Sequence, residues 1–143
     1  MKKISFIICM VALCIFFAAC EEMSALEPGI IDNVQIDIGA SNIFSPEEIE
    51  AATELVTAHF INSFRGCELL SLRYDEEASD REIEISGRDT GTTIVLFSDL
   101  YVSRQAGSAG GTMPGGGPGL HPYWKWILHR DGDSWVLVNW GPV

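Results

Sequence analysis

The chain has 143 residues, and its 9 Lys and Arg against 20 Asp and Glu give a formal net charge of −11 at pH 7. This length is sufficient for one domain with a single hydrophobic core. The acidic balance argues against binding to nucleic acid or to anionic lipid headgroups, because both partners require basic patches. It is compatible with cations, with cationic peptides, or simply with solubility.

The first nineteen residues have the pattern of a secretory signal. Two lysines precede an apolar run over residues 4–17, which is followed by Ala18, Ala19 and Cys20. This order of basic, apolar and small residues is typical of exported proteins. The cysteine after the expected cleavage position resembles the lipobox of bacterial lipoproteins, which implies a diacylglyceryl thioether on Cys20. The alternative, an uncleaved membrane anchor, is disfavoured because a spanning helix needs about 20 apolar residues.

We therefore expect residues 1–19 to be removed and Cys20 to hold the mature chain on the extracytoplasmic face of the cell membrane. The mature chain would carry 7 basic and 20 acidic residues, a net charge of −13. Cys9 and Cys14 would leave with the signal, so Cys67 would be the one remaining thiol. An intramolecular disulfide is then impossible, and the fold must depend on packing. A buried, inert Cys67 is expected rather than a reactive one.

Residues 20–30 are acidic and small and contain Pro28, which predicts a tether between the lipid and a single domain over residues 31–143. Residues 33–39 alternate apolar and polar side chains, as a half-buried strand does. A helix is expected next, over residues 46–64. Ser45 and Glu48 have the spacing of a capping box. The apolar side chains of this helix recur at helical intervals: Ile49, Ala52, Val56, Phe60 and Phe64.

After the helix, the apolar pattern has a period of two residues, which predicts strands. The expected elements are a strand over 67–74, a charged turn over 75–80, a short edge strand over 81–86, a central strand over 92–103, and two strands over 123–130 and 135–140. The last two flank Asp131-Gly132, a strong hairpin signal. Residues 105–122 contain seven glycines and predict a flexible connection; a flap over the open end of the sheet is the alternative.

The predicted fold is therefore of the α+β class, with one long N-terminal helix packed on a curved antiparallel sheet of about five strands. The sequence also resembles an uncharacterised family of lipoproteins from Gram-positive bacteria over about residues 34–141. The resemblance lies in residues 44–49, 66–76, 94–98, 126–131, 135 and 140–141. It implies a cystatin/NTF2-like fold, a helix cradled by a bent sheet, and it assigns no catalytic position.

Asp99 is the candidate for acid–base chemistry. It shares a strand face with Val95, Phe97 and Tyr101. If that face lines a cavity, desolvation would raise the pKa of the carboxyl and fit it for general acid or base catalysis. If the face is open to solvent, Asp99 is an acid between exposed aromatic rings.

Aromatic side chains are concentrated near the C-terminus. Trp124 and Trp126 share one strand face, and both cross-strand core packing and an aromatic binding surface explain such a pair. The candidate binding residues are Tyr101, Trp124, Trp126 and His129. His59 lies beside the apolar stripe of the helix, as a core-edge histidine bonded to a carbonyl or, alternatively, as a ligand or general base.

The sequence shows no nucleophile–base pair, no metal-ligand set and no phosphate loop, so no cofactor is predicted. The acidic run over residues 75–84 lacks the spacing of a calcium loop. These observations favour a lipid-anchored binding or adaptor domain whose partner is a small ligand or an envelope protein. The alternative is a small NTF2-like enzyme that uses Asp99 in a sheet cavity, helped by Tyr74, Tyr101 or His129.

Overall fold

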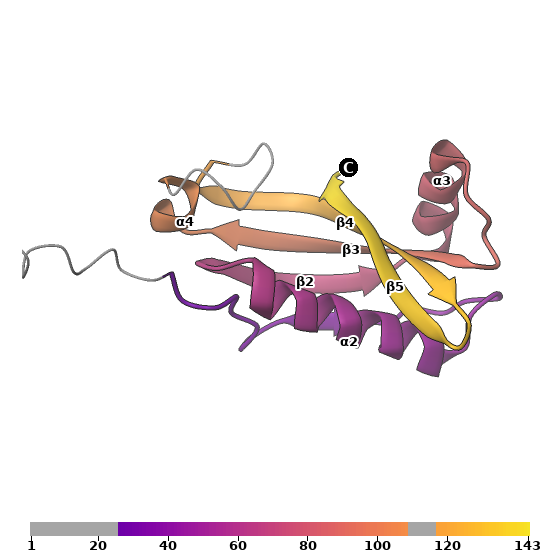
Figure 1. Ribbon diagram of the computed structural model, residues 1–143. Helices are drawn as coiled ribbons and strands as arrows, with labels where there is room; N and C mark the ends of the chain where they lie inside the picture. The colour runs from indigo at the N-terminus through magenta and orange to yellow at the C-terminus, as the bar shows by residue number, and fades with distance from the viewer. Residues whose placement is uncertain (1–25, 109–116) are drawn as a thin grey trace, which may run out of the picture.

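The computed structural model describes residues 26–108 and 117–143. The expected signal, the lipid acceptor Cys20, residues 20–25 of the tether and residues 109–116 of the glycine-rich segment lie outside this part of the chain. The elements in order are β1 (Gln35–Asp37), α2 (Pro46–Ser63), β2 (Cys67–Tyr74), α3 (Glu76–Ser86), β3 (Thr93–Val102), α4 (Arg104–Ser108), β4 (Gly119–Asp131) and β5 (Ser134–Pro142) (Figure 1).

The five strands form one sheet in the order β1-β2-β3-β4-β5. The prediction of an α+β fold with a five-stranded sheet is confirmed, whereas the prediction of an antiparallel, curved sheet is wrong in two respects. First, β1 pairs with β2 in parallel, because the chain returns through the 18-residue helix α2 and such a crossover leaves two strands pointing the same way. Second, the sheet is neither closed nor strongly curled.

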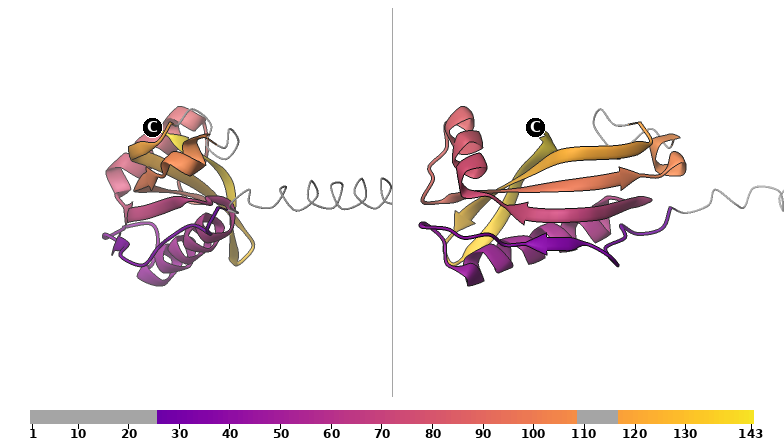
Figure 2. Two further views of the ribbon diagram at one scale, coloured as in Figure 1. Left: turned by 90° about the vertical axis from the view of Figure 1, so that its left-hand side faces the viewer. Right: turned by 180° about the vertical axis from the view of Figure 1, so that it is seen from behind.

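Helix α2 covers one face of the sheet, and α3 packs on the opposite face near one end (Figures 1 and 2). The main core lies under α2, where the helix stripe meets alternate residues of β2, β3 and β4. A smaller cluster joins Ile83 of α3 to Val95, Phe97 and Ile127. The main core therefore lies on the face under α2, and α3 covers the opposite face only in part.

The start of α2 is as predicted. The backbone N–H of Glu48 donates to the Ser45 hydroxyl at 3.3 Å, and the Ser45 N–H donates to the Glu48 carboxylate at 2.8 Å, which completes the capping box. All the predicted stripe residues are buried. His59 is a core-edge residue, with its ring centroid 4.6 Å from that of Trp140 and its Nε2 without a hydrogen-bond partner in the described chain. Desolvation lowers the pKa of His59.

Residues 76–86 form the helix α3, so the prediction of a charged turn and a short edge strand there is wrong. Asp75 caps the helix by accepting the Ala78 N–H at 2.9 Å, and Gly87 ends it in the left-handed conformation. The alternation of Glu and Ile over residues 82–85 imitates a strand, yet only Ile83 is buried, while Ile85 is exposed. Capping at both ends and burial of Ile83 therefore determine the local structure.

The predicted hairpin is confirmed, with Gly132 at a φ of 60° in the turn between β4 and β5. The glycine-rich segment is more ordered at its ends than predicted, because residues 104–108 form α4 and β4 begins at Gly119. At the other end of the chain, the last residues of the expected tether bind the domain. Gly29 donates its N–H to Ile61, and Ile30 donates to Cys67, at 3.0 and 2.9 Å.

Candidate functional site

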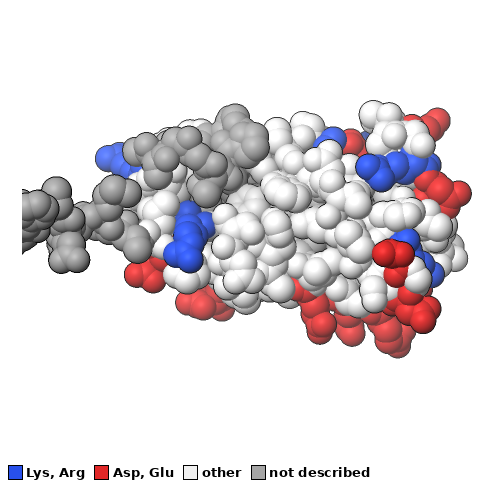
Figure 3. All heavy atoms as spheres, viewed as in Figure 1, with Lys and Arg blue, Asp and Glu red and all other residues white. Residues whose placement is uncertain are grey.

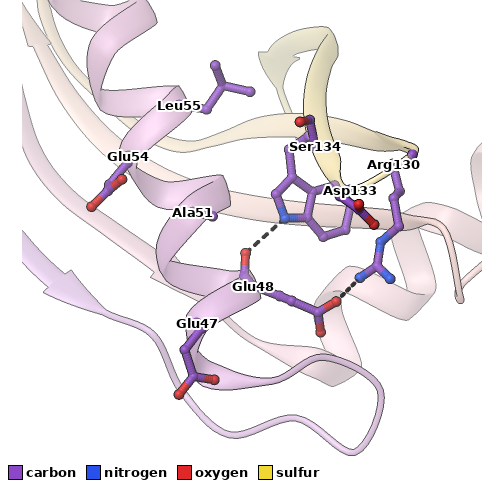
Figure 4. A pocket seen from close by; sticks show the side chains of 10 residues that line it. Glu47, Glu48, Ala51, Glu54, Leu55, Arg130, Asp133 and Ser134 are labelled. Atoms are coloured by element: carbon purple, nitrogen blue, oxygen red, sulfur yellow. Dashed lines mark hydrogen bonds and ion pairs between the residues drawn. The ribbon is translucent and has the colours of Figure 1, made fainter.

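Two hollows of similar size lie in the described part of the molecule. One, of about 640 Å³, lies between the first half of α2 and the β4–β5 hairpin (Figure 4). The other, of about 610 Å³, lies between α3 and the open face of the sheet. We call the second hollow the α3-side pocket. Its lining residues are Arg73, Asp75, Ala78, Arg81, Glu82, Phe97, Asp99, Pro122, Tyr123 and Val143.

The hollow beside α2 contains a structural clamp. The indole N–H of Trp135 donates to the backbone carbonyl of Glu48 at 2.9 Å, and the Glu48 carboxylate forms an ion pair with Arg130. The Arg130 guanidinium also lies 5.1 Å from the centroid of the Trp135 ring. Acidic side chains gather over the first half of α2 (Figure 3), but Glu47 and Glu54 point away from Arg130 in Figure 4. These groups fasten α2 to the hairpin and do not converge on a ligand position.

The α3-side pocket is built around Asp99. One carboxylate oxygen accepts the Ser71 hydroxyl at 2.9 Å and an Arg73 N–H at 3.4 Å. The other accepts the backbone N–H of Tyr123 at 3.0 Å. The Asp99 N–H in turn donates to the Ser71 hydroxyl oxygen at 3.2 Å. A single side chain of β3 thus binds groups from both neighbouring strands, β2 and β4.

Irregular pairing accompanies Asp99 on both sides. The register between β2 and β3 shifts between Leu69 and Ser71, and the register between β3 and β4 shifts between Ser98 and Leu100. Because a bulge inserts one unpaired residue and redirects side chains, bulges are frequent beside functional sites. The shift between β3 and β4 falls at Asp99 itself, which frees this residue from the regular ladder on that side.

Tyr123 is the second unusual feature of the pocket. Its φ of 55° makes it the one non-glycine residue of the described chain with a positive φ. Such a conformation costs on the order of 1–3 kcal/mol for a residue with a side chain, and residues of this kind are concentrated at functional sites. Tyr123 is 62% exposed, and the Arg73 guanidinium lies 5.4 Å from the centroid of its ring. The strained backbone therefore presents an aromatic ring at the mouth of the pocket.

Asp99 lines a pocket, the arrangement for which a raised pKa was expected, but the pKa of this carboxyl is lowered. Partial burial does raise the pKa, but hydrogen bonds from the Tyr123 N–H and the Ser71 hydroxyl, together with the Arg73 guanidinium, outweigh this effect and lower the pKa overall. Asp99 is therefore an anion at neutral pH, with its acceptor capacity largely used within the protein. This carboxylate is suited to positioning Arg73 and Tyr123.

The other candidate residues do not converge on this site. Trp124 and Trp126 are buried between the sheet and α2, and the Trp126 indole donates to Ser98, so neither ring forms a binding surface. Tyr101 and His129 lie on the open face, but Tyr101 pairs with Leu120 and His129 with Thr93, at opposite ends of β3. A separation of eight strand residues corresponds to roughly 26 Å.

The sequence pattern gives no sign that Ser71, Arg73 and Tyr123 belong to a site. The period-two pattern placed Ser71 and Arg73 on one face of their strand, but nothing in it indicated that this face meets Asp99. The sequence predicts Tyr123 as the first residue of an ordinary strand over residues 123–130. Its positive φ has no sequence signal, because tyrosine rarely adopts that conformation.

Comparison with protein-family models, with curated proteins and with solved structures found no match to this chain. Within residues 26–108 and 117–143, no group of three or more His, Cys, Asp or Glu side chains could hold a metal ion. In the same part of the chain, no helix is long and apolar enough to cross a membrane. The α3-side pocket is thus identified by its own geometry.

The strain at Tyr123 can be measured with two substitutions that remove the same ring. Tyr123→Ala keeps a Cβ at positive φ, whereas Tyr123→Gly removes the steric conflict. We expect Tyr123→Gly to be more stable than Tyr123→Ala by about 1 kcal/mol in urea denaturation. Glycine in a strand is ordinarily the less stable of the two, so an alanine variant of equal or greater stability would contradict the strain.

The charge of Asp99 should stabilise the fold at neutral pH. We expect Asp99→Asn to lower the free energy of unfolding by about 1–2 kcal/mol, because the side chain is a third exposed. Since the folded-state pKa is lowered, this stabilisation is present above about pH 4 and is lost as the pH falls through the folded-state pKa. Urea denaturation between pH 7 and pH 2.5 measures it. Asp133→Asn, in the exposed turn, is the control, and an equal loss in both variants would contradict the role of Asp99.

Proposed function

We propose that this protein is a lipid-anchored, extracytoplasmic binding protein and that the α3-side pocket is its ligand site. The observation that supports this proposal most strongly is the strained Tyr123, held by Asp99 beside a pocket of small-molecule size. A fold that needed only packing would gain stability from a glycine at this position. A tyrosine at this strained position favours a role for its ring outside the protein's own core.

The anchor would be a lipid on Cys20, which lies outside the described residues. The described chain begins to bind the domain within a few residues of that position, since Gly66 donates its N–H to the carbonyl of Glu27 at 2.8 Å. A short connection of this kind would keep the domain close to the membrane surface. We also propose a cystatin/NTF2-like relationship for the fold, supported by one long helix lying across a five-stranded sheet.

Binding is favoured over the enzyme alternative by the state of Asp99. A general acid must carry a proton and a general base must have a free lone pair near the substrate. Three donors from Ser71, Arg73 and Tyr123 already favour the charged form and occupy the oxygens. Asp99 in this arrangement serves the pocket by fixing the positions of Arg73 and Tyr123.

An adaptor role is the second candidate, and the edge strand β5 favours it. Residues 134–142 contain no charged side chain in a chain with a net charge of −11. Val136 and Val138 are exposed on this edge. Edge strands are commonly protected by charges against pairing with other chains, so an uncharged edge could accept a strand of an envelope protein.

The anchor is tested by mass spectrometry of the protein from a Gram-positive membrane fraction. We expect a diacylated Cys20 at the N-terminus of the mature chain. Cys20→Ser should release the protein from the membrane fraction, whereas Cys67→Ala, which changes the buried thiol, should leave it anchored. An unmodified chain that begins at Met1 would contradict the proposed location.

The pocket is tested by nuclear magnetic resonance of the ¹⁵N-labelled full chain in a neutral detergent. Aromatic fragments of positive, neutral and negative charge are added separately. We expect at least one class to shift the amide resonances of Arg81, Phe97 and Tyr123. Tyr123→Ala should weaken that binding about tenfold, because it removes the ring. Leu120→Ala is the control and should leave the binding unchanged, because Leu120 is exposed and lies outside the pocket.

No shift in the pocket for any fragment class would contradict the ligand-binding role. The adaptor role would then be the remaining candidate function. It predicts that Val138→Lys abolishes recovery of an envelope partner that co-purifies with the unaltered chain.

A further inference from the structure

We infer that the α3-side pocket takes a small planar anion, a carboxylate attached to an aromatic ring, with Arg73 and Arg81 as its charged contacts. This inference rests on the proposed function, since it names the ligand class of the same pocket. An anionic ligand is not the class that the net charge of −11 of the whole chain would favour. The argument depends on which polar groups in the pocket are already used and which are free.

The acidic side chains of the pocket have their partners within the protein. Asp75 accepts the N–H of Ala78 as the cap of α3. Glu82 forms an ion pair with Lys125 at 2.7 Å, and both side chains are largely buried. Asp99 accepts three donors, as described above. Each of the three carboxylates that line the pocket therefore already has at least one partner within the protein.

The two guanidinium groups have donors to spare. Each guanidinium carries five N–H donors in a planar fork that matches a carboxylate. Arg73 gives one nitrogen to Asp99, at the long distance of 3.4 Å. Arg81 contacts Glu77 at 3.1 Å, where both side chains are mostly exposed, and an ion pair of that kind is weak and readily exchanged. Most of the N–H donors of the two guanidinium groups are thus available to an anionic ligand.

The remaining lining of the pocket is apolar and aromatic. Phe97 lies at the sheet face and is only 5% exposed, whereas the Tyr123 ring is open to solvent and lies against Arg73. Ala78, Pro122 and Val143 complete the apolar part. A flat ring can therefore pack beside Tyr123 while its carboxylate reaches the guanidinium groups. A hollow of about 610 Å³ accommodates a ligand of this size.

The acidity of the whole chain does not prevent this contact. At physiological ionic strength, interactions between exposed charges are screened beyond about 8 Å. The acidic side chains of α2 lie on the other face of the sheet from the pocket. At short range the lining holds three carboxylates, each with a partner within the protein, and two guanidinium groups with donors to spare. One consequence is that added salt should weaken binding of an anion, because the exposed Arg81 contributes to it.

The inference is tested with three probes that share one ring and differ in charge: 2-naphthoate, 2-naphthalenemethanol and 2-naphthylmethylammonium. Each is titrated into the full chain in neutral detergent, and calorimetry gives the affinity while amide resonances of the pocket residues report the site. We expect 2-naphthoate to bind at least tenfold more tightly than the ammonium probe. Arg81→Gln should weaken 2-naphthoate about tenfold and leave the neutral alcohol unchanged.

Arg88→Gln is the matched control, because Arg88 is an exposed arginine just beyond α3 and outside the pocket lining. It should leave the affinity for 2-naphthoate unchanged. Arg73→Lys is a second variant, which keeps the charge but removes the fork, and we expect it also to weaken 2-naphthoate. Urea denaturation of each variant checks that it is folded under the conditions of the titration.

The outcomes separate the ligand class from the site. If the alcohol or the ammonium probe binds in the pocket and 2-naphthoate does not, the inferred ligand class is overturned while the pocket is still a binding site. Equal loss of 2-naphthoate affinity in Arg81→Gln and Arg88→Gln also overturns it, because the effect would then come from net charge. If none of the three probes shifts the amide resonances of the pocket residues, both the ligand class and the proposed function are overturned.

Discussion

The carboxylate of Asp99 is the interaction on which the open face of the sheet depends. It lies where the strand ladder is irregular, and it accepts a hydroxyl from Ser71, an N–H from Arg73 and the backbone N–H of Tyr123. Without this acceptor, the Tyr123 N–H would lose its partner and the guanidinium of Arg73 its nearest counter-charge. The same group therefore holds the strained backbone of β4 and orients the cation above the Tyr123 ring.

The two faces of the sheet make different contributions: one holds the main core and the other holds the pocket. The face under α2 holds the main core, and the clamp of Glu48, Arg130 and Trp135 fastens that helix to the hairpin. Stability can therefore rest mainly on one side. The opposite face is covered by the short helix α3 over part of its length, and the pocket forms at the margin of this cover. Strain at Tyr123 is tolerable because the main core lies elsewhere.

Local signals made much of the fold predictable. The Ser45–Glu48 capping box and the Asp131-Gly132 turn act through neighbouring residues, so the sequence was sufficient for α2 and the hairpin. Helix α3 was missed because its Glu and Ile residues alternate as in a strand, while the evidence for helix lay in its caps. The sequence correctly placed Asp99 on one strand face with Val95 and Phe97, but it left open whether that face lines a cavity. Burial in a cavity alone would raise the pKa of this carboxyl, but its pKa is lowered by groups from β2 and β4 that meet it through two irregular pairings.

The most direct test of this account is a crystal structure of the full chain with bound 2-naphthoate. The account predicts the carboxylate within hydrogen-bond distance of Arg73 and Arg81, the naphthalene ring packed beside Tyr123, and the bonds of Asp99 to Ser71 and Tyr123 intact. Naphthoate bound elsewhere, or bound in the pocket with its carboxylate turned to solvent, would contradict it.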